Sequence, residues 1–513
     1  MSIFTNALQW FRRNEPAAEP RRTRVVRQQQ AYQRSFAGAR QDRLTADFAM
    51  FDSGPNAELE ADLPNLRRRS HQNANDQDHA KRFVELCKTN IVGPDGILID
   101  PQPKTRRGAL DKNAQEKIRN AYKEWTKKAN YTVTGQLSKA SSERLAIESI
   151  VKDGEGLARF VYGADSGNKQ GFAIQHLEAH LLDDQYSIRA SRDRRSIIMG
   201  VEVTSKNRPT GYWLLREHPG EIPTQGPLRM RVPADRMIHA YLARRPGAVR
   251  GVPWMHSSTR RLRQLGGYEE AELVAARHAA EKFGVMVSPD GMPLEGDDED
   301  TDGAALMESQ AGTWEMMPEG YDFRQFDPQH PTAAFDAFVK ANLRSLAAGL
   351  GVSYHSLSMD LSGANYSSLR QGHNEDRDVW RTLQNWFIEH WVQPVYEAWL
   401  ARMLLMNRID LPDEPERFLH ANYRPRGWRH VDPDKGSKAF ETELRLGVNT
   451  RTQYVRETQQ RDLADVLAER VAEEEMAADM GLDLTLTAPE PAQAEPEPTN
   501  EGADNAANEQ ANV

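Results

Sequence analysis

The sequence predicts a mainly helical α+β protein in which a block of strands separates two helical regions. Apolar residues recur at spacings of three and four over most of the chain, as they do in amphipathic helices. Between residues 156 and 241 the pattern changes to an alternation rich in β-branched and aromatic side chains, which is typical of strands. The length of 513 residues corresponds to roughly three domains.

The N-terminal part is expected to be an arm followed by helices. Residues 1–66 are rich in Arg, Gln and Ala and predict a basic, weakly ordered arm. Apolar residues at helical spacing predict helices over residues 74–90, 113–130 and 138–152.

The central block predicts a mainly antiparallel sheet. Turns rich in Gly, Pro and Asp separate the candidate strands. These strands are residues 157–162, 172–177, 197–203, 211–216, 228–233 and 237–241.

A second helical region follows. A helix is expected over residues 256–283, with Ser257 or Ser258 as its N-cap, and another over residues 332–350. Between them, residues 284–331 combine Pro and Gly with an acidic cluster and predict a small β/loop insertion.

A polar loop over residues 353–367 leads to a long helix over residues 368–406, which Pro394 should kink. One face of this helix carries large aromatic side chains, and we expect it to lie in the core or at a subunit interface rather than to stack on bases. Its members in the site prediction are Trp380, Phe387, Trp391 and Trp399.

The C-terminal part is expected to be two or three helices over residues 432–482 and then a disordered tail rich in Pro, Ala, Glu and Asn. From Glu473 to Val513 there are eleven acidic residues and no basic ones. This segment accounts for more than the whole net charge of −9, so the overall charge says nothing against a nucleic-acid partner.

Several classes of chemistry lack their sequence signals. A single cysteine, Cys87, excludes an internal disulfide framework and a multi-cysteine zinc site. No apolar run approaches the ~18 residues of a membrane helix, so we expect no membrane integration. Phosphate-binding glycine loops and a nucleophile elbow are also missing, so we expect no catalytic residues and no cofactor.

Two motifs resemble metal sites, and we expect neither to bind a metal. His176, Glu178 and His180 follow a strand pattern, in which spacing i,i+4 does not bring both imidazoles to one ion. Residues 298–303 match the start of a calcium loop, but Ser309 occupies the position of the closing glutamate. A solvated acidic loop is the interpretation for this second motif.

A set of short stretches forms a recognisable series along the chain. They are Leu66-Arg-Arg-Arg-Ser70, residues 90–97, 236–241, 245–254, 264–276 and 346–352, Asn365-Tyr-Ser-Ser368, residues 393–399 and Val431-Asp-Pro-Asp-Lys435. In this order, over residues 66–482, they resemble the portal proteins of tailed bacteriophages, in the lambda-like family. The resemblance implies a ring, commonly of twelve subunits, at one capsid vertex in the virion, assembled in the host cytoplasm.

The resemblance also implies a portal-type fold with a β-containing wing, paired stem helices, a clip insertion and a long kinked spine helix. The implied parts are an arm (1–66), a wing (67–255), a first stem helix (256–283), a clip (284–331), a second stem helix (332–352), a tunnel loop (353–367), the long helix with a return to the wing (368–431), a crown (432–486) and a disordered acidic tail (487–513).

The implied partners are double-stranded DNA in the channel, the terminase large subunit, the major capsid protein and scaffold, and a head–tail adaptor. The candidate DNA-channel residues are Ser362, Asn365, Tyr366, Ser367 and Ser368. The candidate docking residues of the clip are Asp297, Asp298, Glu299, Asp300 and Trp314. The alternative is a DNA-binding minor capsid or scaffold protein, which would share the basic arm but would need no channel.

Overall fold

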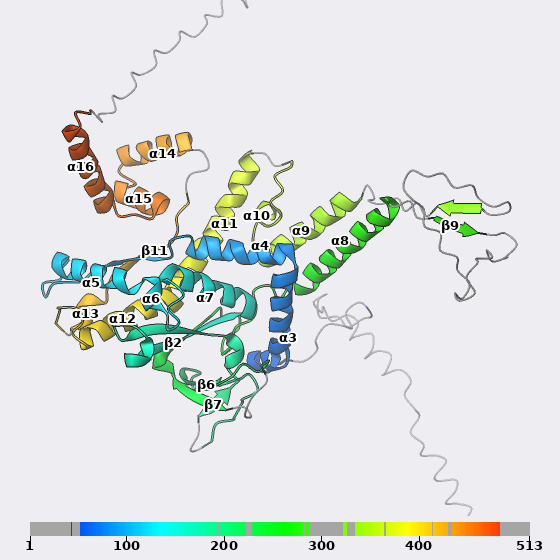
Figure 1. Cartoon of the computed structure of the whole chain (residues 1–513), viewed down its shortest axis with the longest axis horizontal. Coiled ribbons are helices and arrows are strands. Elements are labelled where there is room, and N and C mark those ends of the chain that lie inside the picture. The colour runs from blue at the N-terminus through cyan, green and yellow to red at the C-terminus, as the bar shows by residue number, and fades with distance from the viewer. Residues whose placement is uncertain are drawn as a thin grey trace, which may run out of the picture. The chain divides into compact units, whose positions relative to one another are not determined.

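The computed structural model describes residues 43, 52–191, 195–221, 228–280, 284–287, 322–325, 334–363, 366–412, 414–428 and 433–482 (Figure 1). The chain separates into two compact units, Met1–Gly54 and Pro55–Val513, and nearly all described residues belong to the second. Most of the expected arm, the acidic cluster of the insertion and the expected tail lie outside the described residues.

Helices make up more than half of the described residues of the second unit. The α-helices are α3 (Pro55–Asp76), α4 (Asp78–Cys87), α5 (Lys112–Trp125), α6 (Lys128–Tyr131), α7 (Lys139–Asp153), α8 (Thr259–Ala280), α9 (Phe335–Leu350), α10 (Tyr354–Ser358), α11 (Tyr366–Phe387), α12 (Gln393–Leu405), α13 (Pro415–Phe418), α14 (Pro433–Arg445), α15 (Arg451–Gln459) and α16 (Leu463–Asp479). Two π-helical segments, η2 (Lys88–Val92) and η6 (Ile388–Val392), and three short 3₁₀ turns, η3 (Gly163–Ser166), η4 (Ala179–Leu181) and η5 (Ala234–Arg236), complete the set.

The described strands form small antiparallel sheets, as expected for the central block. They are β1 (Leu98–Pro101), β2 (Glu155–Tyr162), β3 (Phe172–Leu177), β4 (Ser196–Ile198), β5 (Val201–Val203), β6 (Pro209–Leu215), β7 (Arg229–Pro233), β8 (Met237–Tyr241), β9 (Gly284–Val287), β10 (Asp322–Gln325) and β11 (Ala421–Arg424). The sheet orders are β3-β2-β8, β4-β5-β6-β7, β1-β11 and β9-β10.

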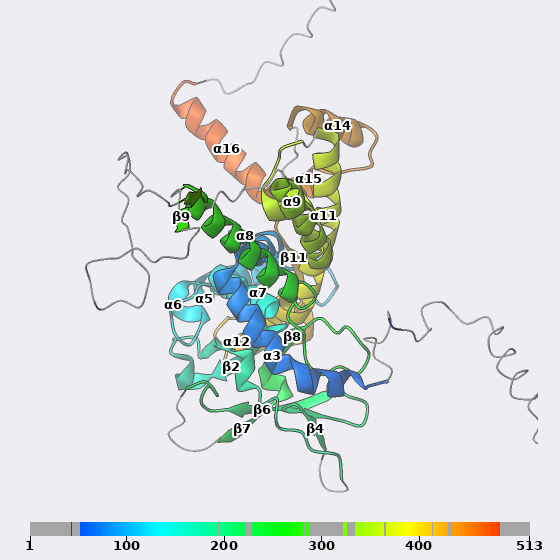
Figure 2. The ribbon, with the colours of Figure 1, turned by 90° about the vertical axis from the view of Figure 1, so that its right-hand side faces the viewer.

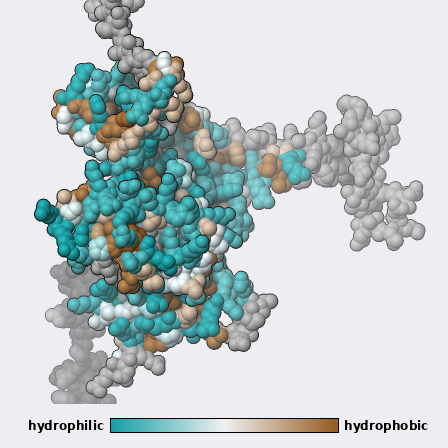
Figure 3. All heavy atoms as spheres, turned by 60° about the vertical axis from the view of Figure 1, so that its left-hand side comes forward, coloured by the Kyte–Doolittle hydropathy of each residue, from teal (hydrophilic) through white to brown (hydrophobic). Residues whose placement is uncertain are grey.

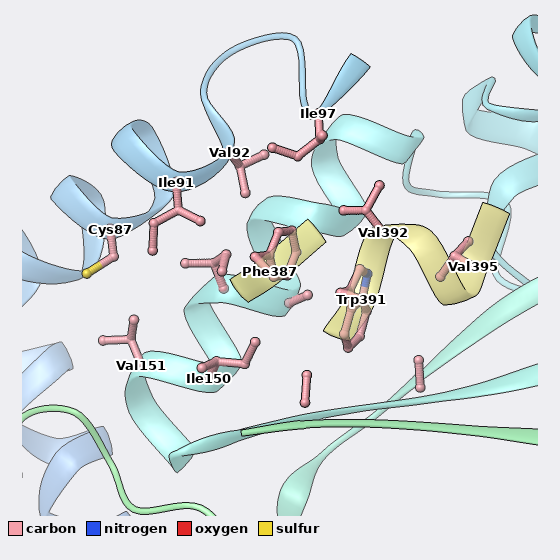
Figure 4. Close-up of a cluster of buried hydrophobic side chains, with 14 of the residues drawn as sticks. Cys87, Ile91, Val92, Ile97, Ile150, Val151, Phe387, Trp391, Val392 and Val395 are labelled. Carbon is pink, nitrogen blue, oxygen red and sulfur yellow. The ribbon is translucent and has the colours of Figure 1, made fainter. Parts of the chain in front are cut away.

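The main core packs the three-stranded sheet against helices that precede it and helices that follow it in the sequence. Residues of α4, η2, α7, η6 and α12 contribute buried side chains to one apolar cluster, part of which Figure 4 shows. The indoles of Trp125 and Trp399 stack with ring centroids 5.6 Å apart and an interplanar angle of 21°. A separate, smaller core lies on the four-stranded sheet, around Met199, Val201 and Leu214.

One predicted strand is in fact a hairpin. The pattern predicts a single strand over residues 197–203, but β4 and β5 pair antiparallel with Ile198 opposite Val201. Met199 and Gly200 form the turn, and both have positive φ values, 46° and 80°. Two-residue turns of this kind are usually signalled by Asn-Gly or Asp-Gly, so the sequence Met-Gly hid this one.

The start of the second unit also differs from the expectation. Residues 55–66, predicted as part of the weakly ordered arm, are helical in α3. The helix predicted over residues 74–90 is interrupted, because Gln77 has extended dihedrals (φ −112°, ψ 120°) and separates α3 from α4. Leu59, Leu63 and Leu66 do follow helical spacing, but the rest of α3 is polar and Pro64 lies inside it, so the sequence did not predict a helix here.

The long helix changes its hydrogen-bond pattern just before Pro394, where the sequence predicted a kink. The α11 helix passes into the π-helical segment η6 and then into α12, with Pro394 in the first turn of α12. Proline lacks an N–H donor and crowds the preceding turn, and a π-bulge is a common way to absorb that local misfit. Trp391 lies within this π segment and is fully buried.

A buried ion network, here called the Glu155 network (Glu155, Arg67, Arg250 and His239), joins α3, β2, β8 and the loop after β8. The Glu155 carboxylate receives hydrogen bonds from Arg67 Nη2 (2.7 Å), Arg250 Nη2 (2.6 Å) and His239 Nε2 (2.9 Å). Burial alone would raise the pKa of Glu155, but Arg250 and Arg67 outweigh it and hold the pKa well below its usual range. The carboxylate is therefore charged within the core.

Two glycines allow the backbone to close around this network. A Cβ on Gly251 would lie 2.0 Å from the carbonyl oxygen of Gly154, and a Cβ on Gly154 would lie 2.2 Å from Val252. Gly154 also ends α7 in the left-handed conformation, with a φ of 87°. The segment carrying Arg250 can therefore pack directly on the start of β2.

Replacing Glu155 with alanine should lower the free energy of unfolding by about 3–5 kcal/mol, because two buried guanidinium groups would lose their counter-ion. Urea denaturation followed by tryptophan fluorescence measures the change. Glu58→Ala is the control, since it removes a half-exposed ion pair with Arg245 (2.8 Å) and should cost less than about 1 kcal/mol. Similar losses in the two variants would contradict the importance of burial.

Candidate functional site

The helices α8 and α9 pack as an antiparallel pair, here called the stem pair, and lie side by side in both ribbon views (Figures 1 and 2). The ring of Tyr268 on α8 stacks on Phe335 at 5.8 Å and meets Phe338 edge-on at 5.1 Å. At the other end, Ser257 Oγ donates to the Gly349 carbonyl oxygen (3.2 Å). Compared with the expected range 256–283, α8 is three residues shorter at each end, and α9 begins three residues later than the expected range 332–350 but ends at the expected residue.

A buried carboxylate fixes the chain where it leaves the stem pair. Asp376 on α11 accepts hydrogen bonds from Ser353 N (2.8 Å), Ser353 Oγ (2.7 Å) and Ser356 Oγ (2.7 Å). Arg82 Nε on α4 donates to the carbonyl oxygen of Ser356 (3.1 Å). The predicted loop over residues 353–367 therefore contains a helical turn, α10, that is bound to two other helices.

Asp360 organises the exposed tip that follows α10, here called the tip loop (residues 359–363). It accepts hydrogen bonds from Ser362 N (2.8 Å), Ser362 Oγ (2.5 Å) and Tyr354 Oη (2.7 Å). Hydrogen bonds from the Ser362 side chain and then from Tyr354 hold the pKa of Asp360 below its usual value. Met359 and Leu361 are exposed. Hydrogen bonds from Ser362 and Tyr354 thus give the tip loop a defined shape and surround its one negative charge.

The structure describes only some of the predicted DNA-channel residues. Ser362 lies in the tip loop, and Asn365 lies outside the described residues. Tyr366, Ser367 and Ser368 form the first turn of α11, which begins two residues earlier than predicted. Sequence reasoning missed Asp360 and Asp376. The Asp-x-Ser spacing of Asp360 is a local turn signal that could have been used, but nothing near Asp376 in sequence indicates its partners.

The predicted clip residues lie outside the described residues. They are Asp297, Asp298, Glu299, Asp300 and Trp314. Within the insertion the structure describes β9 and β10, which pair antiparallel with Val287 opposite Asp322. The incomplete calcium motif of residues 298–303 is likewise outside the described part of the chain.

The aromatic face of the long helix is buried within the chain. Trp380, Phe387, Trp391 and Trp399 have at most 4% of their surface exposed. Of the two alternatives, core or subunit interface, this burial favours the core.

The histidines of the His176/Glu178/His180 motif have different neighbours. His176 bonds Ser142 Oγ (2.6 Å) and stacks on Trp391, and burial lowers its pKa to about 4. The ring of His180 instead lies near His71 and His218. His176 lies on β3, whereas His180 lies in the turn η4, so the predicted strand ends before the second histidine of the motif.

The described helices include none with the length and apolar character required of a membrane span.

The role of Asp376 can be tested against Asp378, two residues further along α11. Asp376→Ala should lower the free energy of unfolding by about 1–3 kcal/mol, because the donors at Ser353 and Ser356 lose their buried acceptor. It should also accelerate hydrogen exchange of the α10 amides. Asp378→Ala, which removes an exposed carboxylate 3.6 Å from Arg381, should change neither measurement appreciably. Unchanged exchange at α10 in both variants would show that Asp376 does not hold this turn.

Comparisons with known proteins give the chain its family. Residues 41–384 match the model of the family described as phage portal protein, lambda family. A probable portal protein of Halomonas phage phiHAP-1 is 32% identical over 464 residues, which cover 87% of this chain and 86% of the relative.

Among solved structures, the chain is similar to a chain in the neck of a native gene transfer agent particle, computed with C12 symmetry, with a TM-score of 0.43 and 14% identity. A chain in the neck of the empty particle, computed with C6 symmetry, gives a TM-score of 0.42 and 14% identity. Both likenesses cover 77% of this chain and 92% of the other. The family model and the phage relative each span most of the sequence, and the chain belongs to the lambda family of phage portal proteins.

Proposed function

We propose that the chain is one subunit of a closed ring at a capsid vertex, through whose channel double-stranded DNA enters during packaging and leaves at ejection. The observation that carries this proposal is the tip loop of a portal-family chain, which is exposed, has one carboxylate and no basic residue, and is held by the hydrogen bond from Tyr354 on α10 to Asp360. In this proposal the role of the chain is structural rather than catalytic.

Exposed apolar side chains support assembly with further copies of the chain. On the stem pair, Leu273 is 65% exposed and Phe338 is 51% exposed. On α16, Leu467 and Val471 are exposed one helical turn apart. In the view of Figure 3, hydrophobic residues form patches within a mostly hydrophilic surface. Neighbouring copies related by a closed rotation would cover such residues, and twelve is the expected number.

The chemistry of the tip loop suits a surface past which DNA slides. Each Lys or Arg that neutralises a phosphate adds affinity and therefore resists movement. Residues 359–363 contain no basic residue, and their one carboxylate is bound by Ser362 and Tyr354. In a ring, one such tip from each subunit would surround the duplex with weak, short-range contacts.

The remaining partners follow from the proposed portal role. The insertion that contains β9 and β10 would be the clip, where the terminase large subunit and later the head–tail adaptor dock. The wing, with its two sheets, would face the major capsid protein and the scaffold. Assembly would take place in the host cytoplasm, and the finished particle would retain the ring. A minor capsid protein that binds DNA without a channel is the competing interpretation, and it predicts no ring.

Ring formation should depend on the exposed apolar residues of α8. Leu273→Asp should keep the fold of the subunit, since the side chain is exposed, but should remove most rings, because a carboxylate would be buried between copies. Electron microscopy and mass photometry of the purified chain measure the outcome. Gln264→Asp, at an exposed polar position of the same helix, is the control and should assemble normally. Normal rings from Leu273→Asp would place this part of α8 outside the interface.

A positive charge on the tip loop should slow DNA movement. Ser362→Lys should reduce the packaging rate several-fold at low salt and less at high salt, because screening weakens attraction to phosphate. Single-particle packaging assays at two salt concentrations measure this effect. Thr442→Lys adds the same charge at an exposed position on α14 and should leave the rate unchanged. Equal rates for the two variants at both salt concentrations would place the tip loop away from the channel.

A further inference from the structure

Three histidines and two carboxylates gather in the wing, here called the histidine cluster (His71, His180, His218, Glu178 and Asp153). They come from α3, from the turn η4, from the loop after β6 and from the end of α7. The fold therefore brings together residues from segments that are distant in the sequence. The strand pattern argued against His176 and His180 as a pair of metal ligands, and in the structure the ring of His180 lies near His71 and His218 instead.

The distances within the histidine cluster approach those of a metal site. One ligand atom from each of His71, Glu178 and His180 lies within 4.8 Å of the others. His218 Nε2 lies 3.4 Å from Glu178 Oε2, and His180 Nδ1 lies 3.7 Å from Glu178 Oε1. Two ligands of a tetrahedral ion with bonds of about 2.1 Å are about 3.4 Å apart. His218 lies outside the group of three that is within 4.8 Å, and rotation of its side chain about the contact with Glu178 would bring it onto the same ion.

Two ring nitrogens of the cluster lack hydrogen-bond partners. His180 Nδ1 and His218 Nε2 are both buried atoms without a partner among the described residues. Buried polar atoms are nearly always paired in native proteins, and an exception requires an explanation such as a bound ion. The two nitrogens face the Glu178 carboxylate, which would share the same ion.

Asp153 supplies the outer contact that metal-binding histidines usually have. Its Oδ1 lies 2.6 Å from His71 Nε2, and its side chain is almost fully buried. When Nε2 keeps its proton for Asp153, Nδ1 of His71 is the nitrogen with a lone pair for a metal. A carboxylate behind a histidine ligand fixes the ring and strengthens its donor character.

We propose that His71, Glu178, His180 and His218 bind one divalent transition-metal ion of the zinc class. Three imidazoles and one carboxylate suit Zn²⁺, Co²⁺ or Ni²⁺, whereas Mg²⁺ and Ca²⁺ prefer oxygen ligands. The four side chains are between 20% and 49% exposed, so an ion can reach them. With four protein ligands the site would be structural, and it would tie α3 to η4 and to the loop after β6.

The test uses the full-length chain with any affinity tag removed and with metal stripped by a chelator. Equilibrium dialysis against Zn²⁺ should give one bound ion per chain, and Co²⁺ should give the intense visible bands of tetrahedral coordination. Zn²⁺ should also raise the melting temperature, because it binds the folded state. His180→Ala and Glu178→Gln should each weaken Zn²⁺ binding at least tenfold.

Two controls keep the proposal falsifiable. His373→Ala, on the exposed face of α11, should bind Zn²⁺ as the parent chain does. Without metal, Glu178→Gln should melt at the parent temperature, because its side chain is half exposed, and weaker binding then reflects a lost ligand rather than a lost fold. Binding that is equal in the parent, His180→Ala and His373→Ala chains, or Co²⁺ spectra of octahedral type in the parent, would overturn the proposal.

Discussion

The structure depends above all on one buried charge, the carboxylate of Glu155. It lies at the start of β2 and accepts hydrogen bonds from Arg67 on α3, from Arg250 in the loop after β8 and from the Gly251 amide. The arginines also donate to carbonyl oxygens, for example Arg67 Nε to Asp153 and Arg250 Nη1 to Met199. Because nearly every donor is used, the charges are tolerated in the core where an unpaired one would be costly.

This network explains why distant parts of the sequence have to fold together. Met199 belongs to the core of the four-stranded sheet, whereas Glu155 begins the central strand of the three-stranded sheet. Arg250 contacts both, so it fixes one sheet against the other through directed hydrogen bonds that apolar packing alone would not provide. Three of the stretches that resemble portal proteins supply Arg67, His239 and Arg250, so these stretches carry the hydrogen-bond donors of the Glu155 network.

Local patterns predicted the elements that local forces determine. The α7 helix follows its N-cap Ser138, and β3 and β8 follow their alternating apolar residues, so the expected and observed ranges nearly coincide. The sequence did not predict what tertiary contacts determine. Examples are the polar α3 helix, stabilised through Arg67, and the anchoring of α10, whose N-cap Ser353 donates to Asp376 on α11.

The candidate sites also divide into one that local sequence indicates and one that only tertiary contacts form. Ser362 could be proposed from sequence because short polar residues between two helices mark an exposed loop. The histidine cluster could not, since its members belong to four separate segments and only the folded wing brings them together. The motif spacing held no information about the cluster, because His176 stacks on Trp391 in the core and two of the three histidines of the cluster lie far from the motif in sequence. Spacing identifies a site only when the ligands share one element.

The tip loop combines two requirements that usually conflict. A loop that faces moving DNA should be rigid, and rigidity in exposed loops often comes from ion pairs, which add basic residues. Here the tip is ordered by short hydrogen bonds to Asp360 and anchored by hydrogen bonds to Asp376, while Lys340 on α9 forms only a long ion pair with Asp360 (3.9 Å) and a closer one with Asp336 (2.8 Å). In the proposed ring any cation on the tip would be repeated in every subunit, and the salt dependence of DNA binding grows with each phosphate contact. Because hydrogen bonds rather than basic residues order the tip, the proposed ring would not repeat a phosphate-binding cation in every subunit. The tip could then be stiff without retaining the duplex.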